Sequence, residues 1–187
     1  LGAGKPERGP AYAWNALWIG VVYWLLILVP LAFAMPSVFA AMGHDPELVR
    51  LESAYVQILL FGGVITMVSR SFSQFFYGMH RPGITLAAAI AGNLVNLLGN
   101  YTLIFGNFGF PELGVAGAAW GTLLGTTVEM LIPLAVFLSP SFNRRYATRA
   151  AWRFSPAHFR NILRLGWPPA LMHGNEIICW AIFMTYF

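Results

Sequence analysis

Long apolar runs constrain the fold of this 187-residue chain more than any other feature. Each run has about twenty residues or more, the length that an α-helix needs to cross a hydrocarbon core of about 30 Å. Charged residues make up only 10% of the chain, whereas soluble domains carry about 25%. The sequence therefore predicts an all-α polytopic membrane protein.

Polar or glycine- and proline-rich segments divide the apolar runs into five expected transmembrane helices. Their expected positions are residues 12–35, 53–76, 84–105, 113–138 and 165–187. The chain begins with Leu1 in a polar loop and ends at Phe187 inside an apolar run. We therefore expect it to be part of a longer protein.

The basic residues predict the orientation of these spans. Lys and Arg gather in residues 1–10, 79–83 and 139–164, whereas the other two loops together carry only Arg50. Cytoplasmic loops carry the excess of Lys and Arg, so these three segments are expected on the cytoplasmic side. Segment 139–164 has six arginines and no acidic residue. We expect it to lie on an anionic leaflet rather than to bind nucleic acid.

Several residues predict local departures from straight helices. Pro30 removes a backbone donor within the first run, which predicts a kink there. Gly62 and Gly63 mark close packing or a flexible point in the second run. Residues 36–52 contain three acidic residues and one arginine, and they are expected to form a loop.

Three asparagines share one face of the third span. Asn93, Asn96 and Asn100 are spaced by three and four residues, which places them on the same side of a helix. Such amides form interhelical hydrogen bonds worth about 0.6 kcal/mol each, or they line a cavity. Amide oxygens also bind hard cations such as Na⁺, and Thr122 on the next span could add a hydroxyl.

Small residues follow in the fourth span. Gly117, Gly121 and Gly125 stand at every fourth position. This spacing lets the backbone of a neighbouring helix come close, so the three glycines are expected mainly to serve packing. The single cysteine, Cys179, excludes a disulfide framework within the chain and is expected to act as a small apolar residue.

Glu176 is the residue that most strongly indicates a function. It lies about ten residues, or about 15 Å, into the last expected span, which is near mid-membrane. A carboxylate at that depth costs about 3 kcal/mol even on lenient scales. It must face a wet cavity, bind a cation, stay protonated or pair with another helix. His173 and Trp180 lie near the same helix face and are candidate cavity residues.

Glu129 is a second intramembrane carboxylate, on the fourth span. It is expected either to line the inner mouth of a cavity or to reach the headgroup region. No motif of a soluble enzyme is present, and no phosphate-binding loop indicates direct use of ATP. These features favour a secondary transporter without a cofactor, in which midplane polar groups bind substrate and ion in turn.

Four stretches resemble one transporter family. They are the opening GAGKPE, the run SRSFSQFFYGMHRPG, the hairpin NLVNLLGNYTLIFGNFGFPELGVAGAAWGT and the segment LRLGWPPALMHGNE. In this order they are similar to the MATE (multidrug and toxic compound extrusion) transporters. The resemblance implies that the five spans are helices three to seven of a twelve-helix, two-lobe fold.

The same resemblance implies a division of the chain into parts of the two lobes. Residues 1–10 would be a cytoplasmic loop, and residues 11–138 would hold helices three to six of the first lobe. Residues 139–164 would be the basic cytoplasmic segment between the lobes, and residues 165–187 the beginning of the second lobe.

The family resemblance also implies a function. It implies a monomeric, multi-pass antiporter of the inner (plasma) membrane that exports cationic organic compounds in exchange for Na⁺ or H⁺. Glu176 matches the carboxylate that the Na⁺-coupled bacterial branch uses for cation coupling. Asn96 and Asn100 match a pair that often reads Asn-x-x-x-Asp, and Thr122 matches a hydroxyl position. Because Asn100 stands where the family often has Asp, an ion site in the first lobe is less favoured. Glu176 is then the stronger candidate for cation coupling.

Two alternative functions remain open from the sequence. A lipid-linked precursor flippase of the same superfamily would be expected to prefer anionic headgroups and a more cationic cavity. The intramembrane charges here are mainly acidic, which argues against it. A non-transporting membrane scaffold or channel is the other alternative, although no repeated filter or charge ring is present.

Overall fold

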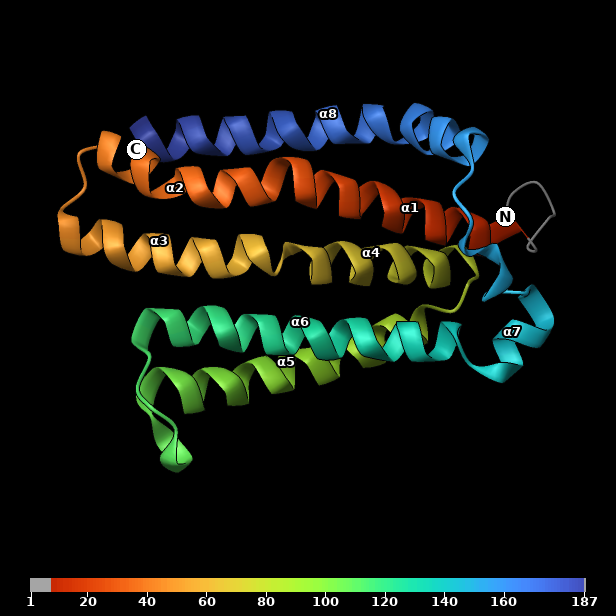
Figure 1. The fold of residues 1–187 in the computed structure, drawn as a ribbon, viewed down its shortest axis with the longest axis horizontal. Helices are drawn as coiled ribbons and strands as arrows, with labels where there is room; N and C mark the ends of the chain where they lie inside the picture. Colours follow the sequence, from red (N-terminus) through yellow and green to blue (C-terminus); the bar gives the residue numbers. More distant parts are fainter. Residues whose placement is uncertain (1–7, 187) are drawn as a thin grey trace.

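The computed structural model describes residues 8–186, apart from the side chains of residues 177–178, 181–182 and 184–186. Most of the expected opening loop, residues 1–7, lies outside the described residues. Within the described part the regular structure is helical (Figure 1). The α-helices are α1 (Gly9–Tyr23), α2 (Val29–Ala41), α3 (Pro46–Phe61), α4 (Gly63–Gly78), α5 (Pro82–Phe105), α6 (Gly114–Phe137), α7 (Pro140–Tyr146) and α8 (Pro156–Tyr186).

The described helices confirm the predicted all-α membrane architecture. Three of them are long and apolar enough to cross a bilayer: Gly9–Ala41, Pro82–Phe105 and Gly114–Phe137. Helices α3 and α4 form a fourth if the pair is counted as one span bent by 42°. Helix α8, which contains the fifth expected span, is not among the described helices that meet this criterion.

Prolines and caps explain where several helices begin. Pro46, Pro82 and Pro140 each occupy the first turn of a helix, where a missing N–H costs nothing. The Asp45 side chain caps α3 by accepting a hydrogen bond from the backbone N–H of Glu47 at 3.0 Å. Each of these starts is therefore encoded locally.

A π-helical turn lies just before Pro30, where the sequence predicts a kink. Residues Trp24–Leu28 form this turn between α1 and α2. The N–H of Val29 bonds to the carbonyl of Trp24, five residues back rather than four. Pro30 follows directly and cannot donate to the carbonyl of Leu26 four residues earlier, so the regular pattern of helical hydrogen bonds is interrupted at this place.

The prediction of a loop over residues 36–52 is wrong in its extent. Helix α2 continues through Pro36 to Ala41, and only residues 42–45 separate it from α3. Pro36 cannot donate to the carbonyl of Ala32 four residues earlier. The side chain of Gln57 on α3 donates to that carbonyl instead, at 3.1 Å. The carbonyl therefore remains hydrogen-bonded, and α2 continues past Pro36 to Ala41.

Gly62, between α3 and α4, and Gly63, the first residue of α4, lie in the close contacts expected of them. A Cβ at Gly62 would collide with Leu123, and a Cβ at Gly63 would lie 2.8 Å from Leu28 Cδ1. The helix also bends here, which frees carbonyls at the end of α3. The indole N–H of Trp24 donates to two of them, the carbonyls of Leu60 and Phe61, at 3.0 Å each.

Helices α5 and α6 form a hairpin whose backbones touch. The turn between them uses Gly106 at φ 67°, a left-handed conformation that suits glycine. A Cβ at Gly99 would lie 3.0 Å from the Cα of Gly121, and a Cβ at Gly125 would lie 2.6 Å from the carbonyl oxygen of Gly92. The glycines at every fourth position of α6 therefore face α5, as their spacing predicts.

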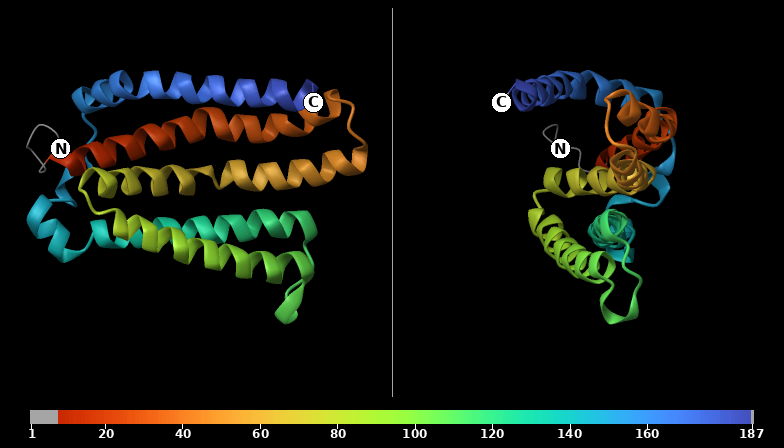
Figure 2. Two further views of the ribbon diagram at one scale, coloured as in Figure 1. Left: turned by 180° about the vertical axis from the view of Figure 1, so that it is seen from behind. Right: turned by 90° about the vertical axis from the view of Figure 1, so that its left-hand side faces the viewer.

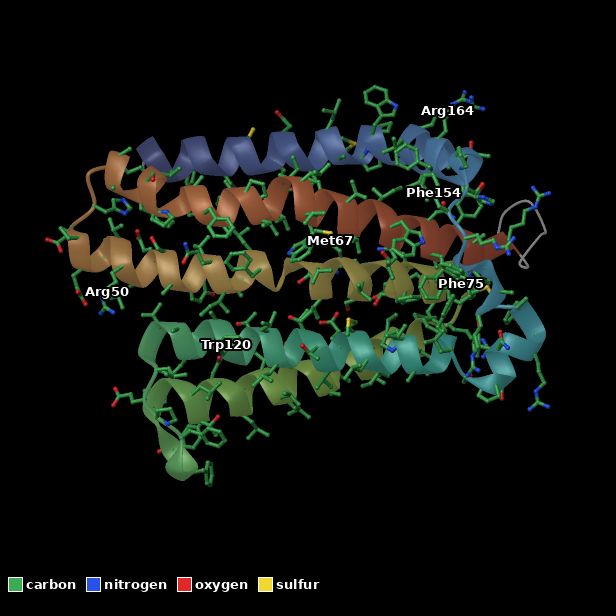
Figure 3. The ribbon with its side chains drawn as sticks, viewed as in Figure 1. Arg50, Met67, Phe75, Trp120, Phe154 and Arg164 are labelled. Carbon is green, nitrogen blue, oxygen red and sulfur yellow. The ribbon has the colours of Figure 1, made fainter. Side chains whose placement is uncertain are left out.

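An aromatic core closes one end of the bundle. Phe72, Phe75 and Phe76 of α4 pack there with Phe137 of α6 and Phe142 of α7. Phe75 lies at this end (Figure 3). The rings of Phe72 and Phe137 are 4.7 Å apart, and those of Phe76 and Phe142 are 5.6 Å apart. This packing holds the short helix α7 against the ends of α4 and α6.

The basic connections share this end of the bundle. The guanidinium of Arg81, in the α4–α5 turn, lies over the Phe142 ring at 5.3 Å from its centroid. The α2–α3 and α5–α6 loops lie at the opposite end (Figure 1). Helix α8 packs beside α1, and α5 and α6 lie on the far side of α3 and α4 (Figure 2).

Gly125→Ala is expected to destabilise the protein by forcing α5 and α6 apart. The new Cβ would meet the Gly92 carbonyl at 2.6 Å and Asn96 Cβ at 2.7 Å. Overpacking of this kind costs about 1–3 kcal/mol. Thermal unfolding in detergent measures the effect. Gly83→Ala is the control, because nothing lies within 4 Å of a Cβ there; equal stability of the two variants would contradict the prediction.

Candidate cation sites

The predicted amides form a hydrogen-bonded chain between α5 and α6. Asn100 Nδ2 donates to Asn96 Oδ1 at 3.3 Å, and Asn96 Nδ2 donates to Thr122 Oγ1 at 3.3 Å. The Thr122 hydroxyl in turn donates to the carbonyl of Ala118 at 2.9 Å. The interhelical hydrogen bonding expected for these amides is therefore present between Asn96 and Thr122.

One acceptor of this chain has no hydrogen-bond donor. Asn100 Oδ1 is buried and has no partner among the described residues. It lies against Gly121, where a Cβ would collide with it. A buried acceptor without a donor is costly, and a cation or a proton donor would satisfy it. This oxygen is therefore an unsatisfied acceptor packed between the α5 and α6 backbones.

A small polar cavity adjoins the amide chain. It has a volume of about 200 Å³, and its lining residues are Gly92, Asn93, Asn96, Thr122, Gly125, Thr126 and Glu129. Glycines at positions 92 and 125 leave the room for it, because a Cβ at Gly92 would lie 3.0 Å from Glu129 Cβ. The cavity thus depends on the same backbone contact that holds the hairpin together.

Glu129 supplies the carboxyl group of this cavity. It is half-buried, and no Lys or Arg side chain forms an ion pair with it among the described residues. Carboxylate, amide and hydroxyl oxygens are the ligands that hard cations prefer. The cavity therefore has the chemistry to bind a small cation or a proton.

Glu176 lies in a separate group on α8. Its Oε2 is 3.5 Å from Nδ1 of His173, and the two side chains are 63% and 74% exposed. A cavity of about 310 Å³ is lined by Glu176, Cys179, Trp180 and Phe183. Cys179 itself is exposed. The aromatic face of Trp180 next to a carboxylate suits an organic cation.

The structure does not bring all the predicted site residues together. Asn93, Asn96, Thr122 and Glu129 line one cavity between α5 and α6, and Asn100 adjoins it through its bond to Asn96. Glu176, His173 and Trp180 lie on α8, across α1 to α4 from that cavity (Figure 1, Figure 2). The candidate residues therefore form two groups.

Thr126 belongs to the first group but was not predicted from the sequence. It lines the cavity, and its hydroxyl donates to the carbonyl of Thr122 at 2.9 Å. Thr126 lies four residues after Thr122 and three before Glu129, so all three share one helix face. That spacing is the signal that could have identified it.

Comparisons with known proteins identify the family. The MatE family model matches residues 1–102. A probable multidrug resistance protein NorM from Synechococcus sp. is 33% identical over 179 residues, which cover 94% of this chain and 38% of that protein. A probable multidrug resistance protein NorM from Mesorhizobium japonicum is 29% identical over 170 residues, covering 88% of this chain and 34% of that protein.

A solved structure has the same fold. It shows the inward-facing conformation of a multidrug resistance MATE family transporter of the MOP superfamily. The TM-score is 0.74 at 24% sequence identity, and the match covers 89% of this chain and 37% of that chain. This chain therefore spans well under half the length of the proteins that it matches.

The apolar helices and their intramembrane polar groups define a multi-pass α-helical membrane protein. The chain belongs to the MatE family, as its sequence motifs predict. Its helices correspond to only part of a longer relative, so the fold and family are shown here for this segment alone.

Thr122→Val is expected to lower the free energy of unfolding by about 0.5–1.5 kcal/mol, the net worth of a typical hydrogen bond. The change leaves Asn96 Nδ2 without its interhelical acceptor, whereas Thr122→Ser keeps it. Thr127→Val is the matched control, because the Thr127 hydroxyl bonds only within α6, to the carbonyl of Leu123. Thermal unfolding in detergent that failed to separate Thr122→Val from the control would contradict this account.

Proposed function

We propose that this chain is part of a secondary antiporter that exports cationic organic compounds in exchange for Na⁺ or H⁺. The observation that carries the proposal is that Glu129 and Glu176, two carboxylates expected within the membrane, have no Lys or Arg partner among the described residues. Intramembrane carboxylates are costly and mark ion or substrate pathways. The multidrug resistance names of the relatives support the same class of substrate.

The proposed arrangement is a twelve-helix protein of the inner (plasma) membrane. Residues 11–138 belong to its first lobe, residues 139–164 connect the lobes, and residues 165–187 begin the second lobe. The α4–α5 turn and the arginines of segment 139–164 share one end of the bundle (Figure 1). We place this end in the cytoplasm, because cytoplasmic loops carry the excess of basic residues.

Glu176 is the proposed coupling residue. In the outward-open state its carboxylate takes up Na⁺ or H⁺, which lowers its affinity for the organic cation. The emptied, ion-loaded protein then returns to the inward-open state and loads new substrate. One carboxylate cannot neutralise both cations fully, so coupling arises from competition. Trp180 offers an aromatic face for the organic cation beside the same carboxylate.

The cavity between α5 and α6 is the proposed second cation site. Asn96, Asn100 and Thr122 supply neutral oxygens, and Glu129 supplies the charge that an aspartate at position 100 would have provided. The carboxyl, amide and hydroxyl groups that line this cavity support its role as a cation site. Binding here would stabilise the close contact of α5 and α6 and so favour one state of the first lobe.

Glu176→Gln is expected to abolish gradient-driven efflux, because the neutral amide cannot exchange a cation for a proton or Na⁺. The full-length transporter in proteoliposomes, loaded with a fluorescent organic cation, is given a Na⁺ gradient or a pH gradient separately. The gradient that drives wild-type efflux names the coupling ion. Glu47→Gln is the control, since Glu47 is an exposed partner of Arg50 at the start of α3. Wild-type efflux by Glu176→Gln would refute coupling at this residue.

Glu129→Gln is expected to raise the ion concentration needed for half-maximal exchange, because the first-lobe cavity loses its only carboxylate. The same proteoliposomes measure exchange over a series of Na⁺ or H⁺ concentrations, again with Glu47→Gln for comparison. An ion dependence identical to that of wild type would contradict a role for Glu129 in binding the coupling ion.

A further inference from the structure

An apolar hollow lies between α1 and the beginning of α8. It has a volume of about 470 Å³, which is within the range of about 300–1,000 Å³ that is typical of small-molecule sites. Its lining side chains are aliphatic or aromatic: Trp18, Ile19, Val22, Tyr23, Phe154, Phe159 and Leu163. Among the described residues, no charged side chain lines it. Such a hollow suits an apolar ligand rather than a small ion.

Hydrogen bonds from α1 fix the chain segment that forms one wall of this hollow. The indole N–H of Trp18 donates to the carbonyl of Trp152 at 3.0 Å. Asn15 is completely buried. Its Oδ1 accepts a hydrogen bond from the backbone N–H of Ser155 at 2.8 Å, and its Nδ2 donates to the carbonyl of Arg153 at 3.4 Å. This wall is therefore held by the protein itself and is ready for a ligand.

Basic side chains surround the wall that residues 154–163 supply. Three arginines are the direct sequence neighbours of lining residues: Arg153 of Phe154, Arg160 of Phe159 and Arg164 of Leu163. All three arginines are exposed, and none forms an ion pair with an acidic residue within the described part of the chain. Phe154 and Arg164 lie at the same end of the bundle, and Arg164 points away from it (Figure 3).

The elements that form the hollow carry no compensating negative charge. Residues 8–41 and residues 139–164 contain no Asp or Glu. The positive charges would repel an organic cation of the kind proposed for transport. A guanidinium group, in contrast, donates two parallel hydrogen bonds to a phosphate. The ligand that fits this place is therefore a phosphate-bearing anion with a long apolar part.

The hollow lies near the level at which headgroups meet acyl chains. The stretch Gly9–Ala41 has 33 residues, which is about 50 Å of helix. Centred on a hydrocarbon core of about 30 Å, it extends about 10 Å beyond the core at each end. Trp18 is about 14 Å from Gly9 along the axis, so the hollow begins just inside the core. Trp and Tyr, which both line it, are enriched at this level.

We propose that this hollow is a binding site for an anionic phospholipid of the cytoplasmic leaflet. One acyl chain fills the hollow, and the phosphate binds the guanidinium groups of Arg153, Arg160 and Arg164. Basic pockets between transmembrane helices on the cytoplasmic side bind such headgroups. The proposal goes beyond a basic segment that rests on a leaflet, because it requires one lipid at a defined place. It relies on the proposed orientation of the bundle, but not on the coupling ion or the exported compound.

Native mass spectrometry of the full-length transporter in detergent, with added phosphatidylglycerol, tests the charged part of the site. The expected result is one lipid bound more tightly than phosphatidylcholine. Arg160→Ala with Arg164→Ala should raise the apparent Kd of that lipid by about fivefold for each arginine removed. Arg144→Ala with Arg145→Ala is the charge-matched control, because these exposed residues of α7 do not adjoin a lining residue.

Two outcomes of this measurement would overturn the proposal. An equal rise of the apparent Kd in both double variants would indicate a general attraction between the basic segment and lipid instead of a defined site. Equal affinities for phosphatidylglycerol and phosphatidylcholine would show that the arginines do not bind the headgroup.

Filling the hollow tests the place of the acyl chain. Val22 lines it and is 53% exposed, so the indole of Val22→Trp would occupy the volume that the chain needs. The apparent Kd for phosphatidylglycerol should rise about tenfold or more, because burial of each CH₂ group contributes to lipid affinity. The Tm of the lipid-free protein should stay unchanged. Val115→Trp on α6 is the control, because Val115 is 42% exposed and lies outside the hollow.

An unchanged lipid affinity of Val22→Trp would overturn binding of an acyl chain in the hollow. A lower Tm of the lipid-free variant would show that another part of the full-length protein fills the hollow, and would overturn the proposal as well. Neither measurement depends on transport. The efflux assay can therefore fail while the lipid site is confirmed, and the lipid site can fail while efflux is intact, so the two failures are distinguishable.

Discussion

The backbone contact between α5 and α6 is the interaction on which the rest of the structure depends. Gly99 meets Gly121, and Gly92 meets Gly125, at distances that no side chain would allow. Inside a bilayer the hydrophobic effect does not drive helices together, so close packing and interhelical hydrogen bonds must do so. The contact supplies the packing, and the bond from Asn96 to Thr122 adds the hydrogen bond.

The same contact creates the polar cavity. Glycines leave space where the two backbones run side by side, and Asn93, Asn96, Thr126 and Glu129 project into it. A polar pocket in the membrane is stable only if its groups bind one another, water or a ligand. Packing and the capacity to bind a cation are therefore two consequences of one glycine pattern.

The sequence was sufficient for features that local chemistry determines. The α5–α6 hairpin follows from its glycine-containing turn and from the glycine spacing of α6. The bend between α3 and α4 lies at Gly62, and the irregular turn lies just before Pro30. Contacts between distant residues were not accessible. The predicted loop over residues 36–52 was wrong in part because Gln57 satisfies the Ala32 carbonyl 25 residues away, which lets α2 continue past Pro36. The other part, the start of α3 at Pro46 with its Asp45 cap, is encoded locally and could have been predicted. The buried side chain of Asn15 bonds to the backbone of Arg153 and Ser155, which lie 138 and 140 residues further along the chain.

Competition between the coupling ion and the organic cation is the central claim of this account. Equilibrium binding of ethidium to the full-length transporter in detergent, measured by fluorescence at increasing Na⁺ or H⁺ concentration, tests it most directly. The account predicts that the apparent Kd rises in proportion to the concentration of the coupling ion. An apparent Kd independent of both ions would contradict it.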